Sequence, residues 1–148
     1  MEKNIPNSTK RASYTYAFKQ INIAIKAAFY LEAITLCESI ISDRLLSHLK
    51  GVGVKKLKLK TTLADLIKEW NKFDKKIMWK ERNDLISDLD NWRVFRNKCI
   101  HSAAKAEPNS PTIPIEEFVS NSKLCSEQGK KLARDICDWH KKTLKEAK

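Results

Sequence analysis

The amino-acid sequence predicts an all-α protein, folded as an antiparallel bundle of four to five helices. Three observations predict this class. The 148 residues include only three glycines and four prolines, fewer than the many tight turns of a sheet protein require. Long segments place apolar residues every three or four positions, which is the period of an amphipathic helix. The segments are joined by short loops, and short loops make successive helices antiparallel.

The composition predicts one soluble domain with a substantial core. Hydrophobic residues make up 42% of the chain and charged residues 32%, which is typical of a globular protein. The periodic pattern covers residues 12–148, and we expect these to form a single helical domain. Residues 1–11 lack periodicity and are interpreted as a flexible N-terminal tail. No apolar run suits a signal peptide or a membrane span, so we expect no membrane contact and a cytoplasmic location.

The first predicted helical segment covers residues 13–49, as one long helix or two helices in line. Gly51 and Gly53 are expected to end it, because glycine readily adopts the left-handed conformation that follows a helix. The next stretch, VKKLKLK at residues 54–60, alternates apolar residues with lysine. This alternation fits a short strand, but we interpret the stretch as a basic loop.

The second half of the chain predicts three more helices. Thr62 is expected to cap a helix over residues 63–73. A further helix is predicted over residues 79–100, followed by a loop at 106–114 that contains three prolines. The last helix is expected from about Pro114, with glutamates in its first turn and lysines in its last, as the helix dipole favours.

The charge balance indicates an anionic partner. Lysine and arginine number 29 against 18 aspartates and glutamates, for a net charge of +11. Such an excess points towards nucleic acid first, and an anionic membrane surface second, as the partner. Charged runs are also common on solvated faces, and that alternative stays open. The cations expected to follow an RNA backbone are Lys55, Lys56, Lys58, Lys60 and Arg93.

The cysteines predict free thiols and no metal site. Cys37, Cys99, Cys125 and Cys137 show no CxxC spacing, and unpaired thiols are usual in the cytoplasm. Cys99 and His101 could supply two zinc ligands, but no second ligand pair has finger-like spacing. The sequence therefore predicts no metal and no cofactor.

The stretch WRVFRNKCIHS, residues 92–102, places an arginine on an apolar helix face. A helical residue advances about 100° around the axis, so one arc of the helix is expected to face the core. Arg96 falls in the middle of this arc, while Arg93, Asn97 and His101 follow its edge. A guanidinium on a core face is costly unless another group compensates it. The arc consists of Leu85, Ile86, Leu89, Trp92, Cys99 and Ile100.

The first helical segment supplies two candidate carboxylates for Arg96. Glu38 is the first choice and Glu32 the second, both expected to face inward. In one interpretation a buried Arg–Glu pair only fixes how two helices align. In the other, a polar pocket at the edge of the bundle turns Arg96, Asn97 and His101 towards a phosphate. Both interpretations remain open at this point.

The string Arg96-Asn97-Lys98-Cys99-Ile100-His101 resembles the R-N-x-x-x-H form of the motif of HEPN domains. These are small all-α bundles, many of which are metal-independent endoribonucleases in toxin–antitoxin and antiphage systems. The preceding DLDNWRVFRN, residues 88–97, looks like the helix that leads into the motif. AFYLEAITLCESIISDRL, residues 28–45, resembles the first long helix of the family, which carries an inward acidic residue.

The resemblance implies a HEPN-like bundle whose catalytic cleft lies between two protomers of a homodimer, with a cognate antitoxin protein as a further partner. His101 suits proton transfer near neutral pH. Arg96 offers a fixed fork of donors for phosphate oxygens, and Asn97 would position the phosphate or the imidazole. Since other members of the superfamily only bind or regulate, a non-catalytic module is the alternative function.

Overall fold

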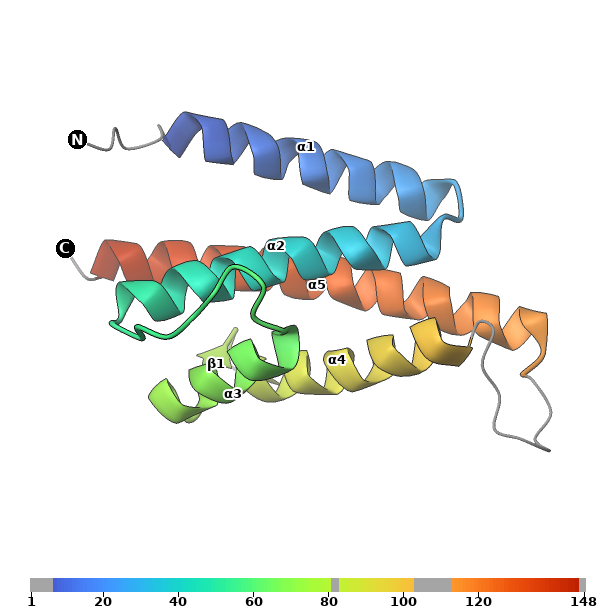
Figure 1. Cartoon of the computed structure of the whole chain (residues 1–148). Coiled ribbons are helices and arrows are strands. Elements are labelled where there is room, and N and C mark those ends of the chain that lie inside the picture. Colours follow the sequence, from blue (N-terminus) through green and yellow to red (C-terminus); the bar gives the residue numbers. More distant parts are fainter. Residues whose placement is uncertain (1–6, 81–82, 103–112, 147–148) are drawn as a thin grey trace.

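The computed structural model describes residues 7–80, 83–102 and 113–146. Within these residues the chain forms five α-helices and one pair of two-residue strands (Figure 1). The prediction of an all-α helical bundle is confirmed. In the described part of the chain, no helix combines the length and apolar character needed to cross a membrane. The helices are α1 (Asn7–Lys26), α2 (Tyr30–Gly51), α3 (Leu63–Phe73), α4 (Leu85–Ser102) and α5 (Ile115–Glu146).

The prediction of one long helix, or two in line, over residues 13–49 is wrong. Helices α1 and α2 form an antiparallel hairpin and lie side by side (Figure 1). The chain reverses at Ala28, which adopts a left-handed φ of 64°, and the Phe29 N–H donates to the Ala24 carbonyl at 2.8 Å. Alanine seldom adopts this conformation, so the sequence carries no glycine or proline that marks the turn.

The N-terminal boundary also differs from the prediction. Helix α1 begins at Asn7, so residues 7–11, assigned to the flexible tail, form the first turns of a helix. The remainder of the predicted tail, residues 1–6, lies outside the described residues. Residues 7–11 contain no apolar side chain, and residues 9–11 are exposed, so this part of the sequence shows no helical period.

The boundaries marked by local sequence signals are confirmed. Helix α2 ends at Gly51, and Gly53 has a φ of 100°. Residues 52–62 form a loop, as predicted for the lysine-rich stretch. Thr62 caps α3, and its hydroxyl accepts a hydrogen bond from the Asp65 N–H at 3.2 Å. These signals act within a few residues, so the sequence alone reveals them.

Helix α4 begins later than predicted, at Leu85 instead of residue 79. The preceding residues form β1 (Met78–Trp79), which pairs antiparallel with β2 (Asn83–Asp84). The Asp84 carboxylate accepts from the backbone N–H groups of Ile77 at 3.0 Å and Ile86 at 3.2 Å. This aspartate thus ends the hairpin and starts the helix. Helix α5 begins directly after Pro114, as predicted, while most of the predicted proline-rich loop lies outside the described residues.

The core depends on a close approach of α2, α4 and α5 at Gly129. A Cβ added to this glycine would lie 2.7 Å from Cζ2 of Trp92 and 3.2 Å from Cβ of Cys37. The Trp92 indole N–H donates to the Cys125 carbonyl on α5 at 2.9 Å, which fixes the ring. The three helices therefore pack at this distance because residue 129 has no side chain.

Gly129→Ala is expected to lower the free energy of unfolding by about 1–3 kcal/mol through overpacking against Trp92. The loss should appear even though alanine favours a helix by about 1 kcal/mol over glycine. Urea denaturation followed by circular dichroism measures it. The control is Glu127→Ala on the exposed face of the same helix, expected within about 0.5 kcal/mol of the wild type. A Gly129→Ala variant as stable as this control would contradict the account.

Candidate functional site

The face of α4 that carries the motif is buried up to its last turn. Leu85, Ile86, Leu89, Trp92 and Cys99 are in the core, as predicted. Ile100 was predicted to join them but is 37% exposed. The reason is that α3 shares surface with the N-terminal half of α4 and does not continue beside its C-terminal half (Figure 1).

Arg96 forms the predicted ion pair with Glu38. Its Nη2 lies 3.0 Å from Oε1 of Glu38, and the two side chains are only 16% and 27% exposed. The pair connects α4 to α2 near the core. Arg96 Nε is buried and has no hydrogen-bond partner among the described residues. Part of the donor capacity of this guanidinium is therefore unused.

Glu32 does not face inward, contrary to the prediction. It is exposed in the first turn of α2. Glu32 and Glu38 are six residues apart, which corresponds to about 240° around a helix axis. The two carboxylates therefore point to different sides of α2, and the compensating acid for Arg96 is Glu38.

Asn97 and His101 lie beside Arg96 on a more accessible strip of α4. Arg93, Asn97 and His101 follow one another at four-residue spacing, so they share one side of the helix. Arg93 pairs with Asp90 at 3.0 Å, Asn97 is half-buried and His101 is exposed. The structure thus brings a held guanidinium, an amide and an accessible imidazole to neighbouring positions near the C-terminus of α4.

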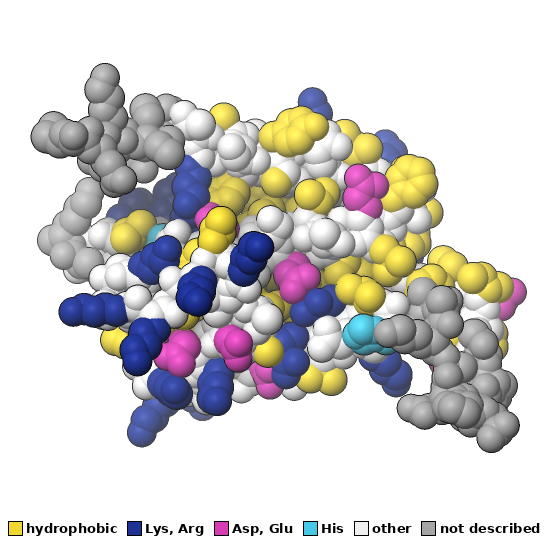
Figure 2. All heavy atoms as spheres, in the orientation of Figure 1, with side chains coloured by type: hydrophobic (Ala, Val, Ile, Leu, Met, Phe, Trp, Pro, Cys, Tyr) yellow, Lys and Arg dark blue, Asp and Glu magenta, His cyan; other side chains and the backbone are white. Residues whose placement is uncertain are grey.

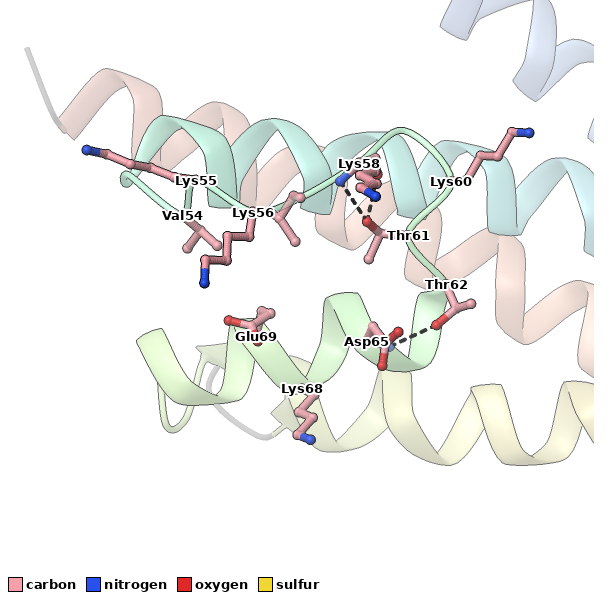
Figure 3. Close-up of a pocket in the computed structure, with 11 residues that line it drawn as sticks. Val54, Lys55, Lys56, Lys58, Lys60, Thr61, Thr62, Asp65, Lys68 and Glu69 are labelled. Atoms are coloured by element: carbon pink, nitrogen blue, oxygen red, sulfur yellow. Dashed lines mark hydrogen bonds between the residues drawn. The ribbon is translucent and has the colours of Figure 1, made fainter.

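The predicted nucleic-acid-binding lysines of the loop are all exposed. Together with residues of α3 they line an open pocket of about 520 Å³. Figure 3 shows that Lys56 points towards the Glu69 side of this pocket, while Lys55 and Lys60 point away from each other. Since the ammonium groups do not converge, this surface suits an extended polyanion better than a small ligand.

Lys68, on α3, continues the basic surface from the loop towards α4. It was not among the residues predicted from the sequence. It lines the pocket below the loop and also a second pocket, of about 330 Å³, whose wall includes Arg93. Cations therefore continue from the loop across α3 to the strip that ends at His101. Figure 2 shows Lys and Arg side chains gathered over the loop and α3. The only signal in the sequence is that Lys68 lies on the polar face of α3.

A second polar cluster joins α1, α2 and α5, at residues to which the sequence analysis gave no role. Asp43 accepts from the Tyr14 hydroxyl, from Arg44 Nη2 at 3.0 Å and from Lys10 Nζ at 3.1 Å. Arg44 Nη1 lies 3.3 Å from Nδ1 of the buried His140. A guanidinium only donates, so this Nδ1 accepts and the imidazole is neutral. Burial, and then the charge of Arg44, lower the pKa of His140 to about 4.

The four cysteines all lie in the described part of the chain. None of the four forms a disulfide, and burial raises the pKa of Cys37 and of Cys125 to about 12. They therefore remain protonated packing groups. Cys99 lies in the core while His101 is exposed, so they do not form a shared ligand pair. In residues 7–80, 83–102 and 113–146, no three His, Cys, Asp or Glu side chains group as a metal site needs.

The ion pair of Arg96 and Glu38 should show an energetic coupling of about 1–2 kcal/mol, because both groups are largely removed from water. A double-mutant cycle with Arg96→Ala and Glu38→Ala, read by urea denaturation, measures this term. Lys142 and Glu146 form the matched control, since this pair is separated by 3.9 Å and both side chains are more than half exposed. That pair should give no measurable coupling. Equal coupling in the two cycles would show that burial does not strengthen the Arg96 pair.

The stability of the protein should fall between about pH 7 and pH 4.5 through His140. Its folded-state pKa of about 4 lies below the ordinary 6.5, so the unfolded chain binds more protons in this interval. Stability is therefore full above the ordinary pKa and is lost as the pH falls, by roughly 3 kcal/mol at most. The charged and titratable groups that act on the His140 ring are His48, Lys10, Arg44 and Asp43. All four are retained when only His140 is replaced.

His140→Gln retains a polar side chain but cannot be protonated. Urea denaturation across this pH interval should therefore give a smaller loss of stability in the variant than in the wild type. The same pH dependence in both proteins would assign the loss to other groups.

Comparisons of this chain with protein-family models, with curated proteins and with solved structures find no match. The candidate site is therefore defined by its own geometry. Its parts are the partly buried pair of Arg96 and Glu38, the nearby Asn97 and His101 of the same helix, and the cations that lead from the loop to α4.

Proposed function

We propose that this protein is a metal-independent endoribonuclease of HEPN type, which acts as a homodimer on single-stranded RNA in the cytoplasm. One observation supports this function above the others. Arg96 is held by Glu38 at 3.0 Å, and a half-buried Asn97 and an exposed His101 follow it within five residues on the same helix. A fixed cation next to an accessible proton-transfer group is what cleavage of a phosphodiester without metal requires.

The reaction needs a base, an acid and positive charge at one phosphate. The base removes the proton of the ribose 2′-hydroxyl, whose oxygen attacks phosphorus. The bond to the 5′-oxygen then breaks, and the acid donates a proton to that oxygen, so the products are a 2′,3′-cyclic phosphate and a 5′-hydroxyl. His101 is the proton-transfer group of each protomer. The donors of Arg96 that Glu38 does not occupy would face the phosphoryl oxygens, and Asn97 would orient the phosphate.

A second protomer solves the problem of having one histidine for two proton transfers. In the proposed dimer, two His101 side chains share one groove, one as base and the other as acid. Exposed apolar side chains support such an interface, because they lie at the end of the bundle where the α1–α2 turn, the start of α5 and the end of α4 meet (Figures 1 and 2). Phe29 is 61% exposed and Ile115 64%, with Leu31 and Val119 also exposed. A second copy that covers these side chains would remove them from water.

The basic surface provides a path for the RNA backbone. Lys56 and Lys60 lie on the loop, Lys68 on α3 and Arg93 on α4, and the last two line one pocket. Phosphates bound along this line would lead a single strand towards His101. A role as a toxin or in antiphage defence, with a cognate antitoxin that restrains the activity, belongs to the same proposal.

A non-catalytic module that binds RNA or regulates a partner is the second candidate function. The ion pair of Arg96 with Glu38 favours this non-catalytic module, since a largely buried pair also serves to align α2 with α4. In that case the basic surface binds RNA or the regulated partner, and His101 contacts solvent or a ligand without transferring a proton. The two functions differ in whether the phosphodiester bond breaks.

Cleavage of end-labelled single-stranded RNA in EDTA separates the two functions. The wild type should give 2′,3′-cyclic phosphate ends, and His101→Ala should lower the rate by roughly 10²–10⁴-fold because a proton transfer is lost. Asn97→Ala should also slow the reaction. Asn91→Ala is the matched control for Asn97, since Asn91 is exposed on the same helix, and it should retain the rate within about twofold.

Absence of cleavage by a folded, dimeric wild type would contradict the ribonuclease and leave the binding module. Cleavage that survives in His101→Ala would indicate a contaminating nuclease or another site. Circular dichroism of each variant confirms that lost activity is not lost structure.

A further inference from the structure

A pocket of about 520 Å³ lies between α1, α2 and α5, around the second polar cluster. Its walls are formed by the N-terminal half of α1, by Arg44 of α2 and by the C-terminal half of α5. Figure 1 shows that these two ends of the chain lie on the same side of the bundle. The volume is within the range of small-molecule sites, and none of the residues in the proposed ribonuclease site lines it.

Positive charge dominates this pocket. Five of the lining side chains are cationic and come from three different helices, while Asp138 is the one lining carboxylate. Asp43, just behind the wall, is shared by Lys10 and Arg44 and offsets part of their charge. The five cations are Lys10, Arg11, Arg44, Arg134 and Lys141. A concave surface with this excess attracts a compact anion with more than one negative charge.

One donor of Arg44, which lines the pocket, lacks an acceptor among the described residues. Arg44 Nε is buried and lacks a hydrogen-bond partner in the described part of the chain. Arg44 Nη1 is directed to a neutral His140, which supplies no negative charge. A guanidinium largely removed from water, with part of its fork unoccupied, favours an anionic acceptor such as a phosphate oxygen.

The aromatic rings of the pocket are not free to stack on a base. The guanidinium of Arg44 lies 4.6 Å from the centre of the Tyr14 ring, and that of Arg134 lies 4.5 Å from the centre of the Phe18 ring. These cation–π contacts occupy the faces that a nucleobase would use. They also hold the two guanidinium groups in place, so the pocket is arranged for phosphate and not for a base.

We propose that this pocket binds a small ligand through a di- or triphosphate group, which is recognised by Arg44, Arg134, Lys141 and the cations of α1. Nucleoside triphosphates and inorganic polyphosphate share this chemistry. Because the cations come from three helices, the bound phosphates bridge the N-terminal half of α1 to α5. The site is separate from the proposed ribonuclease site, and either can exist without the other.

Isothermal titration calorimetry of the full chain at physiological salt tests the proposal, with inorganic tripolyphosphate, ATP and AMP as probes. Tripolyphosphate and ATP should bind with similar affinity. AMP has one phosphate, so its affinity should be lower by at least roughly tenfold. The ATP and tripolyphosphate arms separate recognition of a nucleotide from recognition of the phosphate chain. ATP binding more than about tenfold tighter than tripolyphosphate would overturn recognition through phosphates alone.

A matched pair of double variants tests the location. Arg134→Gln with Lys141→Gln removes two charges from exposed positions in the pocket and should weaken tripolyphosphate binding roughly tenfold. Lys26→Gln with Lys123→Gln removes the same charge from exposed positions outside the pocket and should change tripolyphosphate binding less than about twofold. Lys10→Gln, on α1, gives an independent variant if the first pair unfolds.

Two further results would overturn the proposal. One is the absence of saturable tripolyphosphate binding below about 1 mM, which would leave a basic surface without a site. The other is equal weakening by the two double variants, which would show that only the overall charge of the protein matters.

Discussion

An arginine on the core face of α4 imposes the constraint on which the candidate site depends. Arg96 keeps its charge at every physiological pH, so its burial requires an acid at a fixed place. Glu38 satisfies this requirement at 3.0 Å and ties α4 to α2. The rotation of α4 that puts Arg96 against Glu38 also leaves Asn97 and His101 on its accessible edge. The same ion pair thus aligns two helices and positions the groups proposed to act on RNA.

The part of this arrangement that the sequence predicts follows from requirements within one helix or one turn. Thr62 and Gly51 mark helix ends through local hydrogen bonds and backbone conformation, and the structure confirms both. The pairing of Arg96 was also predictable, because a charged group on an apolar arc needs a partner and α2 offers few acids near its buried face. The choice of Glu38 is confirmed, whereas the helical angle of Glu32 should have excluded it.

The remaining features depend on which helices meet in space, and no local pattern reveals this. The turn at Ala28 has neither glycine nor proline, so the sequence gives no sign that α1 folds back on α2. That hairpin then creates the cluster in which Tyr14 and Arg44 meet His140 of α5. Lys68 likewise gains its place in the basic surface only because α3 packs beside α4. These residues are far apart in the chain, and their grouping is a property of the fold.

The central claim is that two His101 side chains, one from each protomer, act in a single cleavage event. The most direct test mixes wild type with His101→Ala at constant total concentration, lets the protomers exchange, and measures RNA cleavage in EDTA. If both histidines are needed, only dimers with two wild-type chains are active, so the rate should fall with the square of the wild-type fraction. A linear fall would contradict the shared groove, since each protomer would then carry a complete site.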